Sequence, residues 1–499
     1  MTDYPILTLM TFLPLAGAVL ILLLGGAQRA REIALAASLA TLAVSTPLYW
    51  NFDKSSSELQ FVETAQWIPG WEIDYAMGVD GISLPFVLLA AMLTVLCVSV
   101  SWTSVRERVP QFYALLLLAE TAMIGLFSAA NLFLFFIFWE LMVVPMFLLI
   151  GVWGGPSRIK SAVKFLLFTL AGSVLMLVGM VGLYSATGTL DFRALAQFAS
   201  ETGLDHGLQN GLFVCFLAAF AVKVPMFPVH TWLPDAHTEA PTAGSVILAG
   251  ILLKMGAYGF LRVSLPVLPE AVQVFRTSML VLSVVAIVYG AYVTLVQTDV
   301  KRLIAYSSVS HMGFVTLGLF TLNKYGVEGA VLQMINHGII SGALFLCIGM
   351  IYERTHTREI KDYGGVARAA PVYAAFLTLF CLAAAGFPGL NSFVGELLII
   401  GGAFQSDLWL GGLAIWGVVL GAIYVIWLYY RVVMGETNPG LEGLSLEINA
   451  REVAILTPLA FLAVYLGVHP DCVLSYLHET VQALPGLQDL GPLASGATP

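Results

Sequence analysis

Four charged side chains lie inside long apolar runs of this sequence, where they could carry protons. They are Glu140, Lys223, Lys254 and Glu396, in the runs LFLFFIFWELM, FAVKV, ILLKM and FVGELLII. Each charge at the centre of a bilayer costs roughly 2.5–3.5 kcal/mol, so the four together cost about 10–14 kcal/mol. Carboxylates and amines exchange protons but carry out no redox chemistry. A cost of this size favours a function in proton transfer over accidental retention.

The carboxylate of Glu140 could control the proton on Lys223. Burial in a medium of low dielectric weakens the hold of an amine on its proton, and a nearby carboxylate strengthens that hold. Movement of Glu140 towards or away from Lys223 would therefore switch the lysine between keeping and releasing a proton. The alternative is a fixed structural ion pair between the two, although buried pairs are in general poor stabilisers.

Six more titratable residues near or within these runs are candidates for secondary stations of a proton relay. They are His230, His237, His311, His337, Glu120 and Lys164. Histidine suits a relay because it titrates near neutral pH. A simpler role is open for each: the histidines and Glu120 could be hydrogen-bonded core residues, and Lys164 could snorkel to the membrane interface.

The composition predicts that lipid surrounds most of the chain. Of its 499 residues, 59% are hydrophobic and 11% are charged, against about 25% charged in soluble proteins. This excludes soluble enzymes, secreted disulfide scaffolds and disordered proteins, and the net charge of −9 gives no surface for nucleic acid. The five cysteines lack metal-site spacing and no glycine-rich phosphate loop is present, so no cofactor or metal is expected in this chain.

Fourteen membrane-spanning helices are predicted, because a span needs roughly 20 apolar residues. Their ranges are 5–25, 32–50, 82–102, 112–129, 132–152, 161–186, 210–225, 241–261, 276–297, 302–321, 328–352, 370–404, 409–431 and 452–469. The loops on one side contain 14 lysines and arginines. Those on the other side contain only Lys54, Arg193, Arg262, Arg276 and Lys324. Cations concentrate on the inner side of membranes, so both termini are expected outside.

One outer loop is expected to be acidic and partly structured. It spans residues 51–80 and contains Asp53, Glu58, Glu63, Glu72, Asp74 and Asp80.

Two of the fourteen helices are predicted to be interrupted. Pro225 and Pro228 follow Lys223 in the seventh, and the sequence GFPG from 386 to 389 precedes Glu396 in the twelfth. Such breaks persist at membrane depth only where protein or water satisfies the freed backbone groups.

Because the breaks are five helices apart, we expect an all-α membrane protein with two inverted five-helix repeats. The predicted divisions are 1–110 for helices 1–3, 111–263 for helices 4–8, 264–431 for helices 9–13, and 432–499 for helix 14 and the tail.

Several long motifs resemble one family of membrane proteins, the antiporter-like subunits of respiratory complex I and of multisubunit cation/proton antiporters. The motifs span 221–246, 297–313, 387–396 and 78–85, together with Lys254. Within this family the chain resembles the M type, which is similar to mitochondrial subunit 4. Glu396 stands where the L and N types usually carry lysine, and no long lateral helix follows the fourteenth helix.

The resemblance implies a proton-translocating subunit in the membrane arm of an NADH–quinone oxidoreductase. Glu140, Lys223, Lys254 and Glu396 match the family's relay residues. It further implies that FMN, iron–sulfur clusters and quinone are held by partner subunits. The L- and N-type subunits would be neighbours in a bacterial inner membrane. A subunit of a multisubunit sodium/proton antiporter is the alternative function, and a purely structural membrane scaffold is the third.

Overall fold

The computed structural model describes residues 4–71, 73–441 and 443–487; Glu72 of the acidic segment and the end of the tail lie outside this part. The α-helices of the first half are α1 (Ile6–Leu24), α2 (Ala27–Trp50), α3 (Ser83–Ser104), α4 (Val109–Ser128), α5 (Leu132–Leu141), α6 (Val143–Trp153), α7 (Arg158–Thr187), α8 (Phe192–Glu201), α9 (His206–Lys223), α10 (Trp232–Glu239), α11 (Thr242–Ile247), α12 (Leu253–Gly259) and α13 (Leu265–Val267). Those of the second half are α14 (Pro269–Leu295), α15 (Val300–Phe320), α16 (Lys324–Thr355), α17 (Val366–Ala369), α18 (Pro371–Ala384), α19 (Asn391–Ser406), α20 (Leu408–Val433), α21 (Ala450–Val468) and α22 (Asp471–Gln482).

Twelve helical segments of the described residues are long and apolar enough to cross a membrane. The prediction of a predominantly helical, multi-pass protein is therefore confirmed. Two of the twelve consist of several helices in a row, namely α5 with α6 and α11 to α13. The predicted seventh and twelfth helices are not among the twelve. The seventh corresponds to α9, which a break separates from α10, and the twelfth is divided into α18 and α19, of 14 and 16 residues.

Both divisions coincide with the proline- and glycine-containing sequences. The chain leaves helical geometry between Lys223, the last residue of α9, and Trp232, the first of α10. It does so again between α18 and α19, where Gly386 and Gly389 have φ angles of 69° and 87°. Glycine adopts this left-handed conformation without steric cost.

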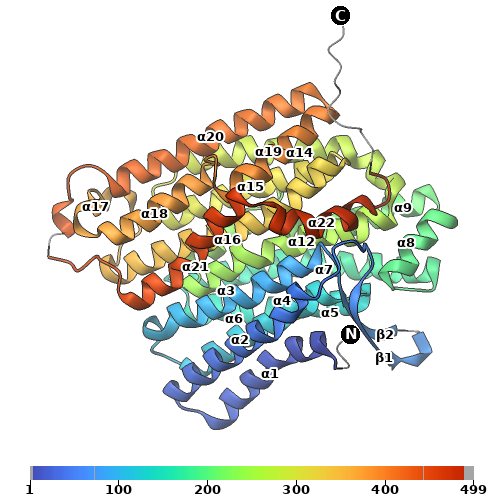
Figure 1. Cartoon of the computed structure of the whole chain (residues 1–499), viewed down its shortest axis with the longest axis horizontal. Coiled ribbons are helices and arrows are strands. Elements are labelled where there is room, and N and C mark those ends of the chain that lie inside the picture. The colour runs from blue at the N-terminus through green and yellow to red at the C-terminus, as the bar shows by residue number, and fades with distance from the viewer. Residues whose placement is uncertain (1–3, 72, 442, 488–499) are drawn as a thin grey trace, which may run out of the picture.

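A β-hairpin occupies the predicted acidic loop, which an all-α prediction did not include. Its antiparallel strands are β1 (Gln60–Ile68) and β2 (Ile73–Val79). Strand β2 is buried along most of its length, and Ala130 N–H, just after α4, donates to the carbonyl of Ala76 at 2.9 Å. Figure 1 shows the hairpin at the same end of the helices as the N-terminus and α8. We call this side of the molecule the hairpin face.

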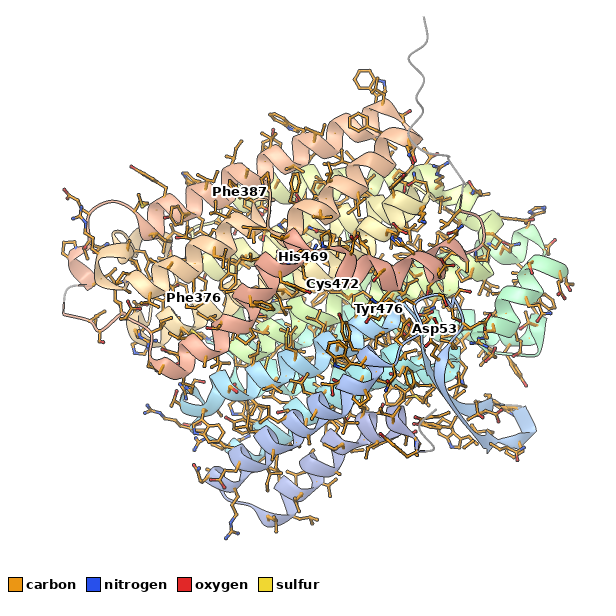
Figure 2. The ribbon with its side chains drawn as sticks, in the orientation of Figure 1. Asp53, Phe376, Phe387, His469, Cys472 and Tyr476 are labelled. Atoms are coloured by element: carbon orange, nitrogen blue, oxygen red, sulfur yellow. The ribbon has the colours of Figure 1, made fainter. Side chains whose placement is uncertain are left out.

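The helix α22, which the sequence did not predict, also belongs to the hairpin face. Its Tyr476 hydroxyl donates to the carbonyl of Tyr49 at the end of α2, at 3.0 Å. Lys54 lies 4.1 Å from the centre of the Tyr476 ring, and Figure 2 shows Tyr476 close to Asp53. The hydroxyl of Thr480 accepts the N–H of Gly81, which precedes α3, at 3.1 Å.

Helix α16 forms the centre of the molecule, since its apolar window is entirely buried. It crosses the segment η2 (Leu248–Leu252), a π-helical turn between α11 and α12, at two glycines. A Cβ on Gly338 would lie 2.8 Å from the carbonyl oxygen of Gly250. This contact requires glycine, because real Cβ atoms do not approach backbone so closely.

Of the five cations expected in outer loops, Arg193 and Lys324 lie in α8 and at the start of α16, and Arg262 and Arg276 lie within helical segments of the membrane spans. Arg276 lies on α14 and donates to the carbonyls of Phe320 and Thr321, at 3.2 and 2.7 Å. Arg262 lies in η3 (Phe260–Ser264), a second π-helical turn between α12 and α13, where it pairs with Asp80. Arg262 and Arg276 can lie within apolar segments because backbone carbonyls or a carboxylate pair with their guanidinium groups.

Candidate proton-relay site

Lys254 lies on α12 between the two π-helical turns and is completely buried. A π turn displaces the regular i→i−4 bonding of a helix, and such turns are frequent at functional sites. Here the ammonium of Lys254 donates to the carbonyl of Ala249 in η2. The same nitrogen lies 2.7 Å from Nδ1 of His337 on α16. The other ring nitrogen of His337 contacts the hydroxyl of Ser341 at 3.0 Å.

From His337 a polar path leads to Glu396. The ring centres of His337 and His311 are 5.7 Å apart. His311, on α15, has Nδ1 at 3.5 Å from Oε1 of Glu396 and Nε2 at 3.2 Å from the hydroxyl of Tyr424. The structure thus brings together two of the four predicted main residues and two of the predicted histidines.

The surroundings of Glu396 on α19 hold its carboxylate in place. Gln333 donates its amide N–H to Oε1 at 3.2 Å, and a Cβ on Gly386 would lie 2.7 Å from Oε2. A small cavity beside His311 and Glu396, lined also by Ser310 and Tyr424, has a volume of about 10 Å³. Such a volume is close to the minimum for one water molecule.

Sequence reasoning missed Gln333, Ser341 and Tyr424. An amide in the middle of an apolar helix was a signal for Gln333, whereas hydroxyl groups are common in membrane helices and gave none.

Lys223 and Glu140 are not in contact in this structure. Lys223 is fully buried, and its ammonium lies 4.8 Å from the centre of the Trp139 ring, a cation–π arrangement. Among the described residues it has no hydrogen-bond acceptor and no carboxylate within 4.0 Å. Glu140 follows Trp139 on α5, and one of its oxygens is buried without a partner in the same described part of the chain. The fixed structural ion pair is therefore not formed.

The two histidines around α10 are buried, and neither is bonded to Lys223 or Lys254. His230 lies in the break before α10, with its ring 5.9 Å from that of Phe227 and 5.3 Å from that of Tyr289. His237 is completely buried on α10 and stacks on Phe345 at 4.7 Å between ring centres. Neither ring nitrogen of His237 has a hydrogen-bond partner within the described ranges.

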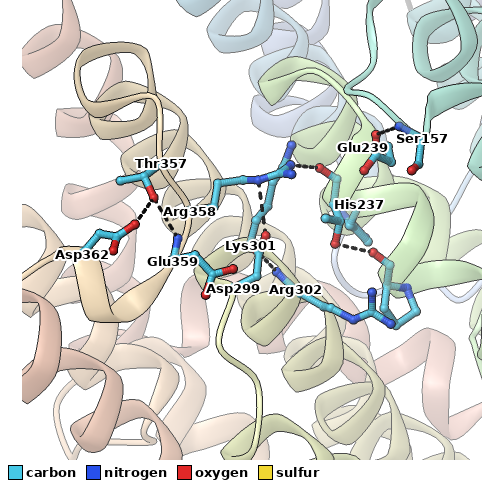
Figure 3. A network of polar contacts seen from close by, with 12 residues as sticks. Ser157, His237, Glu239, Asp299, Lys301, Arg302, Thr357, Arg358, Glu359 and Asp362 are labelled. Carbon is cyan, nitrogen blue, oxygen red and sulfur yellow. Dashed lines mark hydrogen bonds and ion pairs between the residues drawn. The ribbon is translucent and has the colours of Figure 1, made fainter.

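Cations hold the end of α10, beside His237, as Figure 3 shows. Lys301 donates to the carbonyl of Ala240, and Arg358 donates to that of Thr238 at 2.5 Å and pairs with Asp299 at 3.3 Å. The last carbonyls of a helix lack partners within it and attract positive charge. These contacts position the short helix although proline and loop geometry interrupt its connection to α9.

Lys164 and Glu120 differ in their surroundings. The ammonium of Lys164 pairs with Asp235 on α10 and donates to the carbonyl of Thr231, each at 2.7 Å. Lys164 thus fixes the start of α10, while its side chain remains 30% exposed. Glu120 is completely buried on α4, and its two carboxyl oxygens have no hydrogen-bond partner among the residues described. Glu120 therefore does not make the structural hydrogen bonds considered for it, as far as the described residues show.

A buried ion pair on the hairpin face was also missed. Asp80 accepts the N–H groups of Ile82 and Ser83, both at 3.0 Å, and pairs with Arg262. Burial raises the pKa of a carboxyl, but the Arg262 guanidinium and the two N–H donors outweigh burial and hold the pKa of Asp80 below its usual value. Asp80 therefore caps α3 as a carboxylate, and this stabilisation is lost only as pH falls through the lowered pKa.

Across the part of the chain that is described, no three His, Cys, Asp or Glu side chains are placed to hold a metal ion. The arrangement from Lys254 to Glu396 contains an amine, two imidazole rings and a carboxylate. Groups of these kinds can exchange protons.

Known proteins are similar to this chain in sequence and in fold. Residues 129–423 match a family described as "NADH:quinone oxidoreductase/Mrp antiporter, TM". NADH-quinone oxidoreductase subunit M of Rhodobacter capsulatus is 47% identical, with 98% of both chains covered. NADH-ubiquinone oxidoreductase chain 4 of Chondrus crispus is 45% identical, with 95% of this chain and 96% of that one covered.

A solved structure agrees with these relatives. A chain of respiratory complex I from Thermus thermophilus, with bound NADH, is 30% identical and has a TM-score of 0.87, with 95% of this chain and 98% of that one covered. The resemblance inferred from the motifs is confirmed. The chain belongs to the family of antiporter-like membrane subunits that includes subunit M of NADH-quinone oxidoreductase and chain 4 of NADH-ubiquinone oxidoreductase.

Proposed function

We propose that this chain translocates protons as a membrane-arm subunit of an NADH:quinone oxidoreductase. The observation that carries the proposal is the buried path from Lys254 through His337 and His311 to Glu396. Redox chemistry in other subunits supplies the energy, because this path contains only groups that exchange protons. The chain is thus one part of a translocase and holds no redox centre itself.

Protons enter near Lys223, reach Lys254 through water, and leave near Glu396. Lys223 and Lys254 have no direct contact, so water must bridge them. Glu140 acts as the switch when it approaches Lys223 across Trp139. Moving one charge against 100 mV requires roughly 2.3 kcal/mol. A change of about 2 pKa units, at 1.36 kcal/mol each, balances this requirement.

The secondary residues have separate roles in this proposal. His311 and His337 are stations of the path. His230 and His237 supply the intake side, next to the end of α10, and Lys164 positions that helix. Glu120 is a further candidate station, and its two buried oxygens have no hydrogen-bond partner among the described residues.

The finer architecture is part of the proposal. The two divided helices, α9 with α10 and α18 with α19, complete a set of fourteen with the twelve spans described above. Helices 4–8 and 9–13 then form two inverted repeats over residues 111–263 and 264–431, between the N-terminal unit 1–110 and the C-terminal unit 432–499. Both termini are assigned to the outside of a bacterial inner membrane, and so is the hairpin face.

The partners follow from the same assignment. L- and N-type antiporter-like subunits adjoin this chain in the lipid bilayer, and FMN, iron–sulfur clusters and quinone reside in other subunits. A charge change in a neighbouring subunit biases Glu140, which is half-buried in this chain.

The test replaces Lys254 by alanine in the intact complex. Inner-membrane vesicles then report protons moved per NADH oxidised, and the variant is expected to move fewer because the path loses its central amine. Lys361→Ala removes an exposed lysine and is the control. An unchanged ratio in an assembled Lys254→Ala complex contradicts the proposal. Sodium-driven proton exchange without NADH oxidation in the purified complex supports the antiporter alternative.

A further inference from the structure

A buried carboxylate on the hairpin face is not part of the path described above. Glu328 lies near the start of α16, and only 4% of its side chain is exposed. Two basic groups face it: Nδ1 of His478 on α22 at 2.7 Å and the ammonium of Lys324, one turn earlier on α16, at 3.8 Å. Within the described residues no other charged group pairs with Glu328.

His478 connects this carboxylate with water. Its side chain is 43% exposed, although its Nδ1 faces the buried Glu328. Helix α22 is fixed at two further points, since the Tyr476 hydroxyl donates to Tyr49 and the Thr480 hydroxyl accepts from Gly81. The imidazole is therefore held with one nitrogen on the carboxylate.

The same helix links Glu328 to Glu396. Gln333, which donates to Glu396, lies five residues after Glu328 on α16, or about 7.5 Å along the helix axis. The other amide atom of Gln333, Oε1, is buried with no partner among the described residues. At this level α16 and α19 touch through glycines, where a Cβ on Gly329 would lie 3.0 Å from the Gly395 carbonyl. The free Gln333 Oε1 is an acceptor for a water molecule on the stretch between Glu396 and Glu328.

We propose that Glu328 and His478 form the proton-release site of this subunit on the hairpin face, which rests on the proton-translocating function above. The proton of Glu396 passes to the Glu328 carboxylate along a chain of water molecules beside Gln333, whose amide N–H orients the Glu396 carboxylate. Glu328 then protonates Nδ1 of His478 and returns to the carboxylate. The imidazolium releases a proton from Nε2 to the outer water, and a flip of the half-exposed ring then presents its unprotonated nitrogen to Glu328 for the next cycle. Lys324 favours each return to the carboxylate.

The experiment compares Glu328→Gln and His478→Ala with Lys254→Ala in vesicles that contain the intact complex. Membrane potential per NADH oxidised is the readout. Each release-site variant is expected to lose the same fraction of the wild-type potential as Lys254→Ala, because all three interrupt one route. Glu479→Gln changes the exposed neighbour of His478 on α22 and should retain the wild-type value.

Chemical rescue separates proton transfer from a structural role. Free imidazole should restore the potential of His478→Ala but not of Glu328→Gln, because only the former lacks an imidazole. Pyrazole, a ring of the same size but a poor base, should restore neither. Equal rescue by both rings, or full activity of His478→Ala, overturns the proposal.

Two further measurements keep the test decisive. If His478→Ala does not assemble, His478→Gln preserves a hydrogen bond to Glu328 and is expected to lose the potential all the same; retention overturns the release site. If Lys254→Ala is impaired while both release-site variants are normal, the release site alone fails. If Lys254→Ala itself is normal, the proposed function fails.

Discussion

At the scale of single residues, the proposed relay depends on side chains that bear no charge. Glu396 has its carboxylate held by Gln333 on one oxygen and limited by Gly386 near the other. His337 has Ser341 on the nitrogen that does not face Lys254. These neutral neighbours set the distances between titratable groups, and a proton transfers efficiently only over hydrogen-bond distances.

Gly386→Ala is therefore expected to impair pumping without removing a titratable group. The new Cβ would lie 2.7 Å from Oε2 of Glu396 and displace the carboxylate from His311. The residue also has a φ of 69°, where a side chain costs about 1–2 kcal/mol. Protons per NADH in vesicles should fall, while the amount of assembled complex should decrease only moderately.

Gly389 provides the matched control in the same break. Its φ is 87°, and a Cβ there would meet nothing within 4 Å. Gly389→Ala thus carries a similar backbone strain without contact to Glu396. If the two variants pump equally well, displacement of the carboxylate is not the cause.

At the scale of elements, the sequence predicted the helices and their interruptions well, because length, hydropathy and proline positions are local properties. Lys223 and Glu396 were found because charges in apolar runs are conspicuous. The contacts Lys254–His337 and His311–Glu396 join helices far apart in sequence, and no periodicity reports which helices cross. The π turns around Lys254 were also unpredictable, since they result from packing against α16.

The crossing of α16 with η2 is expected to fix the distance between Lys254 and His337. Gly338→Ala would place a Cβ 2.8 Å from the Gly250 carbonyl and separate the two segments. Overpacking of this kind costs typically about 1–3 kcal/mol. The variant should show lower protons per NADH and a lower melting temperature of the purified complex.

Gly342, one turn further along α16, is the control for this crossing. A Cβ there would lie 3.6 Å from the nearest side-chain atoms, which is an ordinary contact. Gly342→Ala should therefore assemble and pump normally. A defect of equal size in both variants would indicate that any alanine in this helix is harmful, and not that the crossing sets the relay.

At the scale of the whole molecule, the polar path lies between two faces of different charge. The hairpin face has an acidic β1–β2 segment, and the opposite face has the cations around α10 and the arginines of the predicted inner loops, such as Arg354 and Arg358. The proposed transport, which ends at the hairpin face, is outward only if the hairpin face lies outside the membrane. Because lysine and arginine concentrate on the inner side of a membrane, we expect that orientation.

Labelling with a membrane-impermeant maleimide in intact cells tests this orientation. Ser55→Cys on the hairpin face and Gln28→Cys at the start of α2 are both exposed positions. Cys472→Ser is included in both variants, because this half-buried cysteine on α22 would otherwise contribute. Ser55→Cys should react in intact cells and Gln28→Cys only after the cells are broken. The reverse pattern would place proton release at Glu328 on the inner side, and the direction proposed for the relay would then be wrong.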